Sequence, residues 1–218
     1  MNACSVITSL VLATSALLAM TSSAQSVKLD VSQVPEQKEW GQQAVKIMEE
    51  WHPRISQFLA SPGFTPPGKC SLLIDKNYKG VAFTTGTKIT VSSEWIAKHP
   101  EDLGVAVHEL VHVVQQYPPG QPVWVTEGIA DYIRWVQYEK KKLKELPVAN
   151  EDKGYTKGYQ VTAGFFLWLE KNGGEGIVRK LNAAMRKKQY SDQIFEDVTG
   201  TNLDDLWSQY LAVREKGK

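Results

Sequence analysis

The sequence lacks the features that mark several large classes of protein. Its formal net charge is only +1, with 25 basic and 24 acidic residues among 218, so no overall field favours binding to nucleic acid or to an anionic membrane. It contains no internal repeat and no low-complexity linker, which excludes a repeat array and gives no sign of a second domain. Hydrophobic residues make up 42% of the chain, an ordinary share for a globular protein that buries a core.

Charged side chains are absent from residues 1–26, and residues 6–20 are almost wholly apolar or small. Ser22 and Ala24 supply small residues before a cut between Ala24 and Gln25. This pattern predicts a secretory signal peptide over residues 1–24, a single domain over 25–218, and a secreted or periplasmic protein. A retained membrane anchor is the alternative, but the apolar run is short for a span of about 20 residues. We therefore expect no membrane attachment after cleavage.

Cysteine is scarce, with only Cys4 and Cys70 in the chain. Export normally permits disulfides, but Cys4 would leave with the signal peptide. The mature chain would then keep one cysteine, which excludes an internal disulfide. Cys70 lies in the strand-like segment KCSLLID, where a small buried hydrophobe is its expected role.

Local patterns predict a small sheet followed by helices, that is, an α+β fold with a mixed or antiparallel N-terminal sheet and a mostly helical C-terminal half. An amphipathic helix is expected over residues 40–58, kinked or broken near Pro53. Residues 70–75, 80–85 and 88–93 are rich in β-formers and predict three strands. The last of these is a candidate edge strand for binding an extended peptide. Helices are expected over residues 100–117, 126–142, 155–171, 177–188 and 203–216.

The segment AVHELVHVVQQY carries the clearest chemical signal. His108 and His112 stand four residues apart, so a helix places both imidazoles on one face. A shared divalent ion explains why a core helix would carry two adjacent imidazoles. With Glu109 they form H-E-x-x-H, the zinc-protease helix motif, and we predict one bound Zn²⁺.

A catalytic zinc site uses three protein ligands and leaves one position for water. Glu127, in TEGIADY on the next predicted helix, is the preferred third ligand. Asp131 lies one turn further and could accept the free N–H of a ligand histidine, which would fix its tautomer. The opposite assignment, with Asp131 as the ligand, remains open at this stage.

Glu109 is placed about 100° around the helix from His108, where it can flank the ion without binding it. It is the predicted general base for a zinc-activated water that hydrolyses a peptide bond. The oxyanion needs a further hydrogen-bond donor. We prefer Tyr159, which the predicted helix places on one face with Tyr155. The other candidates are Tyr155 itself, Tyr117, Tyr132, His52 and His99.

The order of three motifs resembles a known family. H-E-L-V-H, then E-G-I-A-D-Y, then G-Y-Q-V-T-A-G-F-F-L-W resembles the basic secretory protein family of plants and bacteria, across residues 34–210. The family consists of secreted zinc metallopeptidases with a gluzincin-like site. The resemblance implies a zincin-like fold with zinc on His108, His112 and Glu127, Glu109 as the base, and Asp131 orienting His108. The balanced charge of this chain argues against the attraction to polyanions that the family name suggests.

The expected function is therefore that of a secreted zinc metallopeptidase, a monomer that acts on peptide or protein substrates. The alternative is a non-catalytic secreted zinc-containing protein with a binding or defence role. Zinc-dependent hydrolysis of a non-peptide substrate is a third hypothesis. Glu109 favours the enzyme, because a purely structural zinc site has no need of a carboxylate there.

Overall fold

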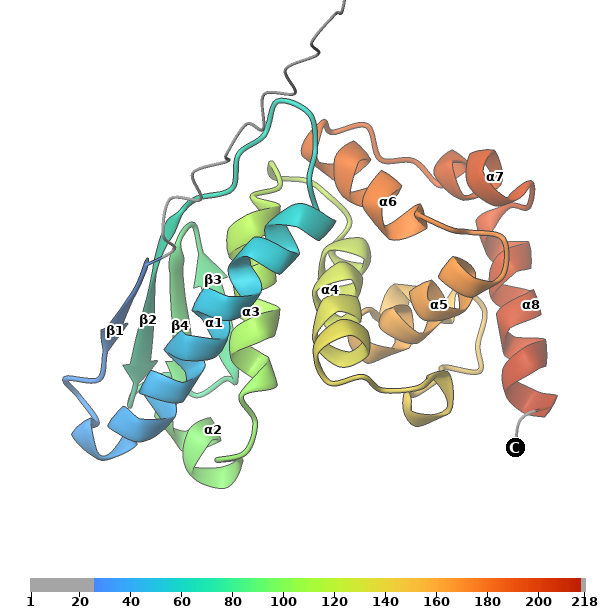
Figure 1. Ribbon diagram of the computed structural model, residues 1–218. Helices are drawn as coiled ribbons and strands as arrows, with labels where there is room; N and C mark the ends of the chain where they lie inside the picture. The colour runs from blue at the N-terminus through green and yellow to red at the C-terminus, as the bar shows by residue number, and fades with distance from the viewer. Residues whose placement is uncertain (1–25, 217–218) are drawn as a thin grey trace, which may run out of the picture.

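The structure is a computed structural model that describes residues 26–216 (Figure 1). The predicted signal peptide and its cut after Ala24 lie outside these residues. The first part of the described chain forms a four-stranded sheet with two helices packed on it, and the rest is helical. This arrangement confirms the predicted α+β class.

The sheet has the strand order β1-β2-β4-β3 and is mixed. Its strands are β1 (Ser26–Asp30), β2 (Lys69–Asp75), β3 (Ala82–Thr85) and β4 (Lys88–Ser92). β1 pairs with β2 and β2 with β4 in parallel, whereas β3 and β4 form an antiparallel hairpin. The hairpin around Gly86 is confirmed as predicted.

Two strand predictions need correction. β1 was not predicted, because its sequence SVKLD is short and half exposed and carries two charges. The segment that begins at residue 88 was expected to be a peptide-binding edge, but β4 lies inside the sheet between β2 and β3. The edge strand on that side is β3. The order of strands along the chain does not reveal this, because β2 pairs with β4 and skips β3.

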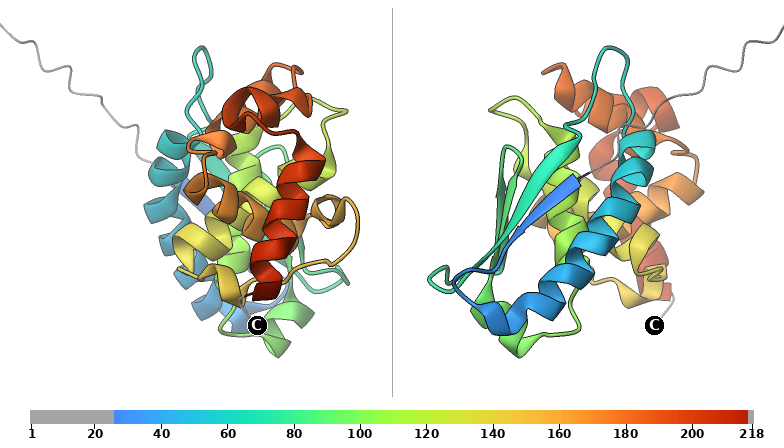
Figure 2. Two further views of the ribbon diagram at one scale, coloured as in Figure 1. Left: turned by 90° about the vertical axis from the view of Figure 1, so that its right-hand side faces the viewer. Right: turned by 60° about the vertical axis from the view of Figure 1, so that its left-hand side comes forward.

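α1 (Lys38–Phe58) and α3 (Gly104–Gln115) lie side by side against one face of the sheet (Figures 1 and 2). α1 continues through Pro53, so the predicted break is wrong. Proline removes one hydrogen bond from the helix. Trp51 and Ile55, on either side of Pro53, are buried in the core, and this packing holds the turn in place.

The segment before α3 also differs from the prediction of one helix starting at residue 100. A short helix, α2 (Ser93–Lys98), comes first, and α3 starts only at Gly104. The carboxylate of Asp102 accepts hydrogen bonds from the backbone N–H of Val105 and from the indole of Trp95. Asp102 therefore caps the start of α3 and ties it to α2.

The remaining helices form the second half of the molecule. They are α4 (Val123–Asp131), the π-helix η2 (Tyr132–Tyr138), α5 (Tyr159–Lys171), α6 (Ile177–Arg186), α7 (Gln193–Thr199) and α8 (Leu203–Lys216). Three short 3-10 turns are η1 (Pro35–Gln37), η3 (Leu143–Glu145) and η4 (Gly154–Lys157). α7 was not predicted, and α4 begins three residues earlier than expected.

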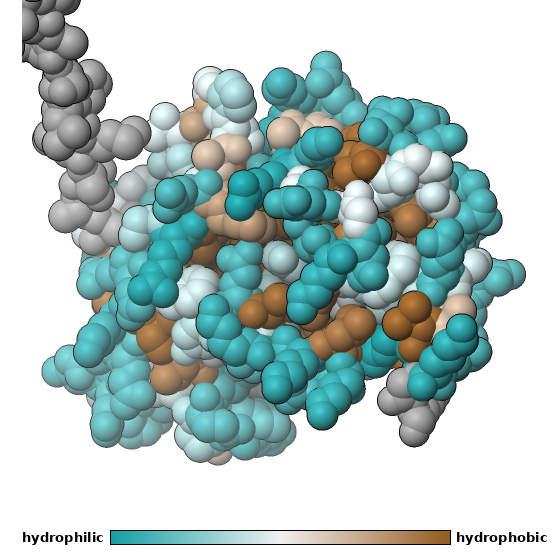
Figure 3. All heavy atoms as spheres, turned by 45° about the vertical axis from the view of Figure 1, so that its right-hand side comes forward, coloured by the Kyte–Doolittle hydropathy of each residue, from teal (hydrophilic) through white to brown (hydrophobic). Residues whose placement is uncertain are grey.

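α5 is the central helix of this half. Its residues from Thr162 to Leu169 are all buried, and its Phe165 ring packs against Trp168, Trp207 and Tyr210. The face over α6 to α8 is mainly hydrophilic, with apolar side chains scattered among polar ones (Figure 3). Within residues 26–216, none of the helices combines the length and the apolar character that crossing a membrane requires.

Candidate metal centre

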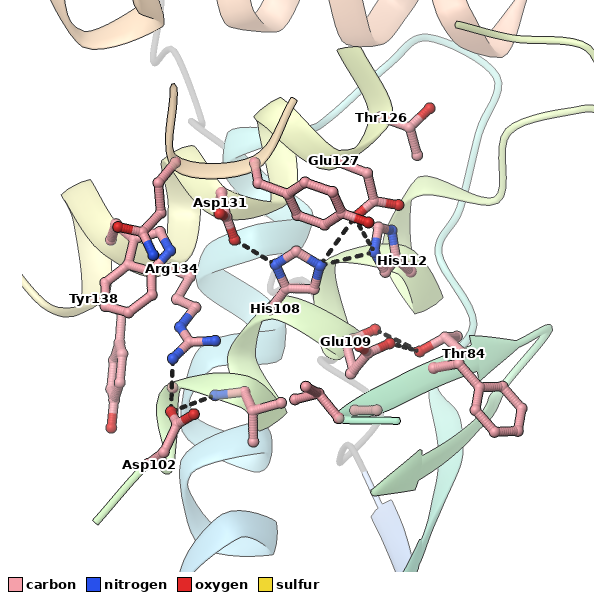
Figure 4. A pocket seen from close by; sticks show the side chains of 18 of the residues that line it. Thr84, Asp102, His108, Glu109, His112, Thr126, Glu127, Asp131, Arg134 and Tyr138 are labelled. Atoms are coloured by element: carbon pink, nitrogen blue, oxygen red, sulfur yellow. Dashed lines mark hydrogen bonds and ion pairs between the residues drawn. The ribbon is translucent and has the colours of Figure 1, made fainter. Parts of the chain in front are cut away.

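Two helices bring two histidines and a glutamate together (Figure 4). His108 and His112 lie on one face of α3, and Glu127 lies on α4 after the chain has reversed through residues 116–122. Oε2 of Glu127 is 3.1 Å from Nε2 of His108 and 3.4 Å from Nε2 of His112. The two Nε2 atoms are 3.1 Å apart. Three ligand atoms therefore converge on one point, and the three predicted ligands meet.

Gly128 allows α4 to reach this position. A Cβ atom at residue 128 would lie 2.3 Å from Cγ2 of Thr162 on α5, a distance at which one helix would have to move. The absence of that atom lets α4 pack closely against α5 and holds Glu127 over the two histidines. The glycine in TEGIADY thus has a packing role beside the chemical role of its neighbour.

The three separations fit a tetrahedral metal site. Zinc binds nitrogen and oxygen ligands at about 2.0–2.2 Å in tetrahedral geometry, which places neighbouring ligand atoms about 3.3 Å apart. The separations of 3.1, 3.1 and 3.4 Å agree with this value. Among residues 26–216, these three form the one group of His, Cys, Asp and Glu side chains with metal-binding geometry. The group can hold a metal ion.

Outer partners fix which nitrogen of each imidazole faces the centre. Asp131 lies 2.6 Å from Nδ1 of His108, on the side away from Glu127. Gln115 donates from Nε2 to the carbonyl of Thr126, so its Oε1 accepts from Nδ1 of His112 at 2.8 Å. Both Nδ1 atoms therefore carry protons, and both Nε2 lone pairs point inward. Three acceptors that face one another in this way form a group that can hold a cation.

The electrostatics of the site lead to the same conclusion. Burial disfavours the charged form of His108, but hydrogen bonds to Asp131 and Glu127 outweigh burial and raise the pKa of His108 well above its ordinary 6.5. Burial also opposes ionisation of Glu127, but hydrogen bonds from both histidines lower the pKa of Glu127 well below its ordinary value of 4.5. Glu127 therefore stays a carboxylate, and the acidic groups around His108 favour a positive charge beside it, a place that a proton or a metal ion can take.

Glu109 lies next to the three candidate ligands but is not one of them. Its side chain is buried, with 5% exposure, and it lines the cleft. Its Oε2 accepts a hydrogen bond of 2.7 Å from the hydroxyl of Thr84 on β3. The carboxylate is therefore held at the edge of the centre by the sheet, in the flanking place that the helical motif predicts.

Tyr159 lies close to the centre, although the backbone before it differs from the predicted helix. The predicted helix over residues 155–171 is interrupted at Gly158, and α5 starts at Tyr159 in the left-handed region with φ +51°. The ring stacks over His108 with 6.5 Å between centroids, and the side chain is 55% exposed. The charge of Glu127, followed by partial burial, raises the pKa of Tyr159. Its hydroxyl thus stays protonated at neutral pH and can donate.

The interruption separates Tyr155 from Tyr159, so the prediction that they share one helical face is wrong. Tyr155 is buried in η4, packs edge-to-face against Trp207 and donates to the carboxylate of Asp204 at 2.7 Å. The backbone reversal at Gly158 sends the two rings in different directions. Of the two tyrosines, only Tyr159 lines the cleft.

The other candidate oxyanion donors fit less well. His52 is a buried residue of α1, where its Nε2 lies 2.9 Å from the carbonyl of Pro67, and burial lowers its pKa. Tyr132 stacks on Phe58 in the core. Neither lines the cleft. Two others do line it but are engaged elsewhere: the hydroxyl of Tyr117 donates to Asn182, and the ring of His99 stacks on Trp95.

The centre opens into a cleft of about 1680 Å³. β3 forms one wall, α3 the floor, and α4 with η2 and Tyr159 the opposite wall. At one end, the guanidinium of Arg134 lies 2.6 Å from Asp102 and 3.2 Å from Glu139. The contact with Asp102 ties η2 to the segment before α3. The cleft is large enough for several residues of an extended peptide.

Two residues of the site were not predicted. Gln115 could have been found, because it is a polar residue three positions after His112 on an otherwise apolar helix. Thr84 gave no signal, because it lies 25 residues before Glu109 and only the packing of β3 on α3 brings them together.

Comparison with known proteins gives one match. A family model named BSP and described as "Peptidase of plants and bacteria" matches residues 37–210. The matched range contains every residue of the site described above. No curated protein and no solved structure matches the chain.

Proposed function

Because the chain belongs to the BSP family of peptidases of plants and bacteria, we propose that it is a secreted zinc-dependent peptidase. The observation that carries the proposal is the arrangement of His108, His112 and Glu127. Their donor atoms lie 3.1–3.4 Å apart, and outer partners turn both imidazoles inward. The two nitrogens and one carboxylate oxygen form the His₂Glu set of catalytic zinc sites.

A zinc ion bound there would supply Lewis acidity, which makes water easier to deprotonate and polarises a carbonyl. The buried carboxylate of Glu109 would accept the proton of the attacking water and deliver it to the leaving amine. The hydroxyl of Tyr159 would donate to the oxyanion. Asp131 and Gln115 would keep both histidines in the tautomer that binds metal.

The substrate would lie along β3. This strand is the edge of the sheet on the side of the cleft, and an edge strand can pair with an extended peptide through main-chain hydrogen bonds. Phe83 on this strand and Val81 just before it are exposed and line the cleft, so they would contact apolar side chains of the substrate.

Secretion remains part of the proposal. It rests on the signal-like pattern of residues 1–24, with residues 25–218 as one mature domain that acts as a monomer. N-terminal sequencing of the protein released from cells would test it, and an N-terminus at Gln25 is the expected result.

Removal of the ion tests the central proposal. Purified protein should contain about one zinc per chain, and a chelator should abolish cleavage of casein until zinc is restored, because the ion is required for the chemistry. Metal analysis by mass spectrometry and a casein assay on the same sample are the measurements. A protein that holds zinc but cleaves no member of a peptide library would instead be a zinc-containing binding protein.

The role of Tyr159 is tested by Tyr159→Phe, which removes only the hydroxyl. We expect kcat to fall by about 10²-fold, the usual effect of losing one oxyanion donor, with zinc content unchanged. The matched control is Tyr155→Phe, the same substitution four residues earlier at a buried position. Steady-state kinetics on a fluorogenic peptide compares them, and equal kcat values for Tyr159→Phe and wild type would remove Tyr159 from the mechanism.

A further inference from the structure

Thr84 connects the edge strand to the proposed general base. Its hydroxyl lies 2.7 Å from Oε2 of Glu109 and 3.1 Å from the Glu109 backbone carbonyl. A threonine hydroxyl has one proton to donate, and the carboxylate is the nearer and the charged acceptor. The hydrogen bond to the carboxylate is therefore the stronger one. Figure 4 shows it reaching from β3 to α3 beside the two histidines.

The register of the hairpin sets the direction of the Thr84 backbone. The N–H of Ser92 donates to the carbonyl of Val81 at 2.9 Å. In an antiparallel ladder, hydrogen-bonded and non-hydrogen-bonded pairs alternate. The pair Thr84↔Ile89 therefore falls in a non-hydrogen-bonded position. The N–H and C=O of Thr84 point away from β4, toward the free side of β3.

The main chain and the side chain of Thr84 thus face two different partners. Its main chain faces the side of β3 where a substrate strand would pair, and its side chain holds the carboxylate of Glu109. The neighbouring Thr85 is exposed and, in a strand, points to the opposite face. One residue therefore joins the substrate-binding edge to the base.

We propose that Thr84 is a positioning residue that fixes the rotamer of Glu109 and aligns the base with a peptide paired to β3. This inference rests on the proposed peptidase function. With Oε2 occupied by the threonine hydroxyl, Oε1 is the oxygen that remains to take a proton from water. A buried carboxylate without this partner would lose a charge-assisted hydrogen bond and would sample other rotamers.

The test compares Thr84→Val, which keeps the shape and removes the hydroxyl, with Thr84→Ser, which keeps the hydroxyl. We expect Thr84→Val to lower kcat by roughly 10–100-fold, the usual cost of removing an outer partner of a functional group. KM and zinc content should stay close to wild type. Thr84→Ser should restore most of kcat. Thr85→Val, on the other face of the same strand, is the matched control and should behave as wild type.

A crystal structure of zinc-loaded Thr84→Val supplies a readout that does not depend on activity. We expect the Glu109 carboxylate to leave its wild-type position while the rest of the centre superposes. An unmoved Glu109, or a Thr84→Ser variant as slow as Thr84→Val, would overturn the positioning role. If the wild type cleaves no peptide, the proposed function fails, and the position of Glu109 in the variant still decides whether Thr84 holds it.

Discussion

Glu109→Gln is expected to keep its zinc and to lose peptide cleavage by roughly 10²–10⁴-fold, the range attributed to a general acid–base group. The substitution keeps the size and shape of the side chain and removes only its ability to take a proton. Thr84 can still donate to the amide oxygen of the glutamine, so the side chain should stay in place. Parallel measurement of kcat/KM and of zinc content separates a loss of chemistry from a loss of metal.

Glu101→Gln is the matched control for this variant. Glu101 also lines the cleft but is exposed and lies before α3, so the same change in charge occurs there without removal of the base. Its activity should stay within about twofold of wild type, as expected for a surface substitution. If Glu109→Gln cleaves peptides as fast as Glu101→Gln, Glu109 is not the base and the proposed mechanism is wrong.

Glu127→Ala should release the ion. The substitution removes one of three ligands and leaves the two imidazoles exposed to water, so affinity for zinc should fall by more than the 10–100-fold that loss of an outer partner causes. Peptide cleavage should fall with zinc occupancy. Competition with a chromogenic chelator at fixed pH measures the affinity, and circular dichroism checks that the helices remain.

Asp131→Ala provides the comparison that decides between the two assignments of the third ligand. Asp131 contacts Nδ1 of His108 at 2.6 Å, behind the ring, whereas Glu127 contacts Nε2 of both histidines. We therefore expect Asp131→Ala to weaken zinc binding by about 10–100-fold and Glu127→Ala to weaken it more. The reverse order would make Asp131 the ligand.

The sequence was most informative where spacing along one helix determines geometry. His108, Glu109 and His112 lie within five residues of one helix, so their relative directions follow from its 3.6-residue turn. Glu127 required the further step that α4 folds back beside α3. The four-residue separation from Asp131 then placed that carboxylate on the same face, and the hydrogen bond to His108 follows from it.

The sequence was least informative where contacts join distant segments. The pairing of β2 with β4, the bond from Thr84 to Glu109 and the capping of α3 by Asp102 all depend on packing between elements. The break at Gly158 was missed for a different reason. Apolar periodicity continues through it, and a single glycine does not say whether the backbone takes a positive φ.

The ligands of the proposed ion come from two helices that pack against different parts of the molecule. A bound ion would therefore affect the stability of the fold. α3 packs on α1 and the sheet, whereas α4 packs chiefly on α5. An ion shared between them would act as a cross-link between the two layers. With Cys70 as the single cysteine in residues 26–216, that region can form no internal disulfide. Metal at about 1,000 times its dissociation constant would stabilise the fold by about 4 kcal/mol, comparable to a disulfide bridge.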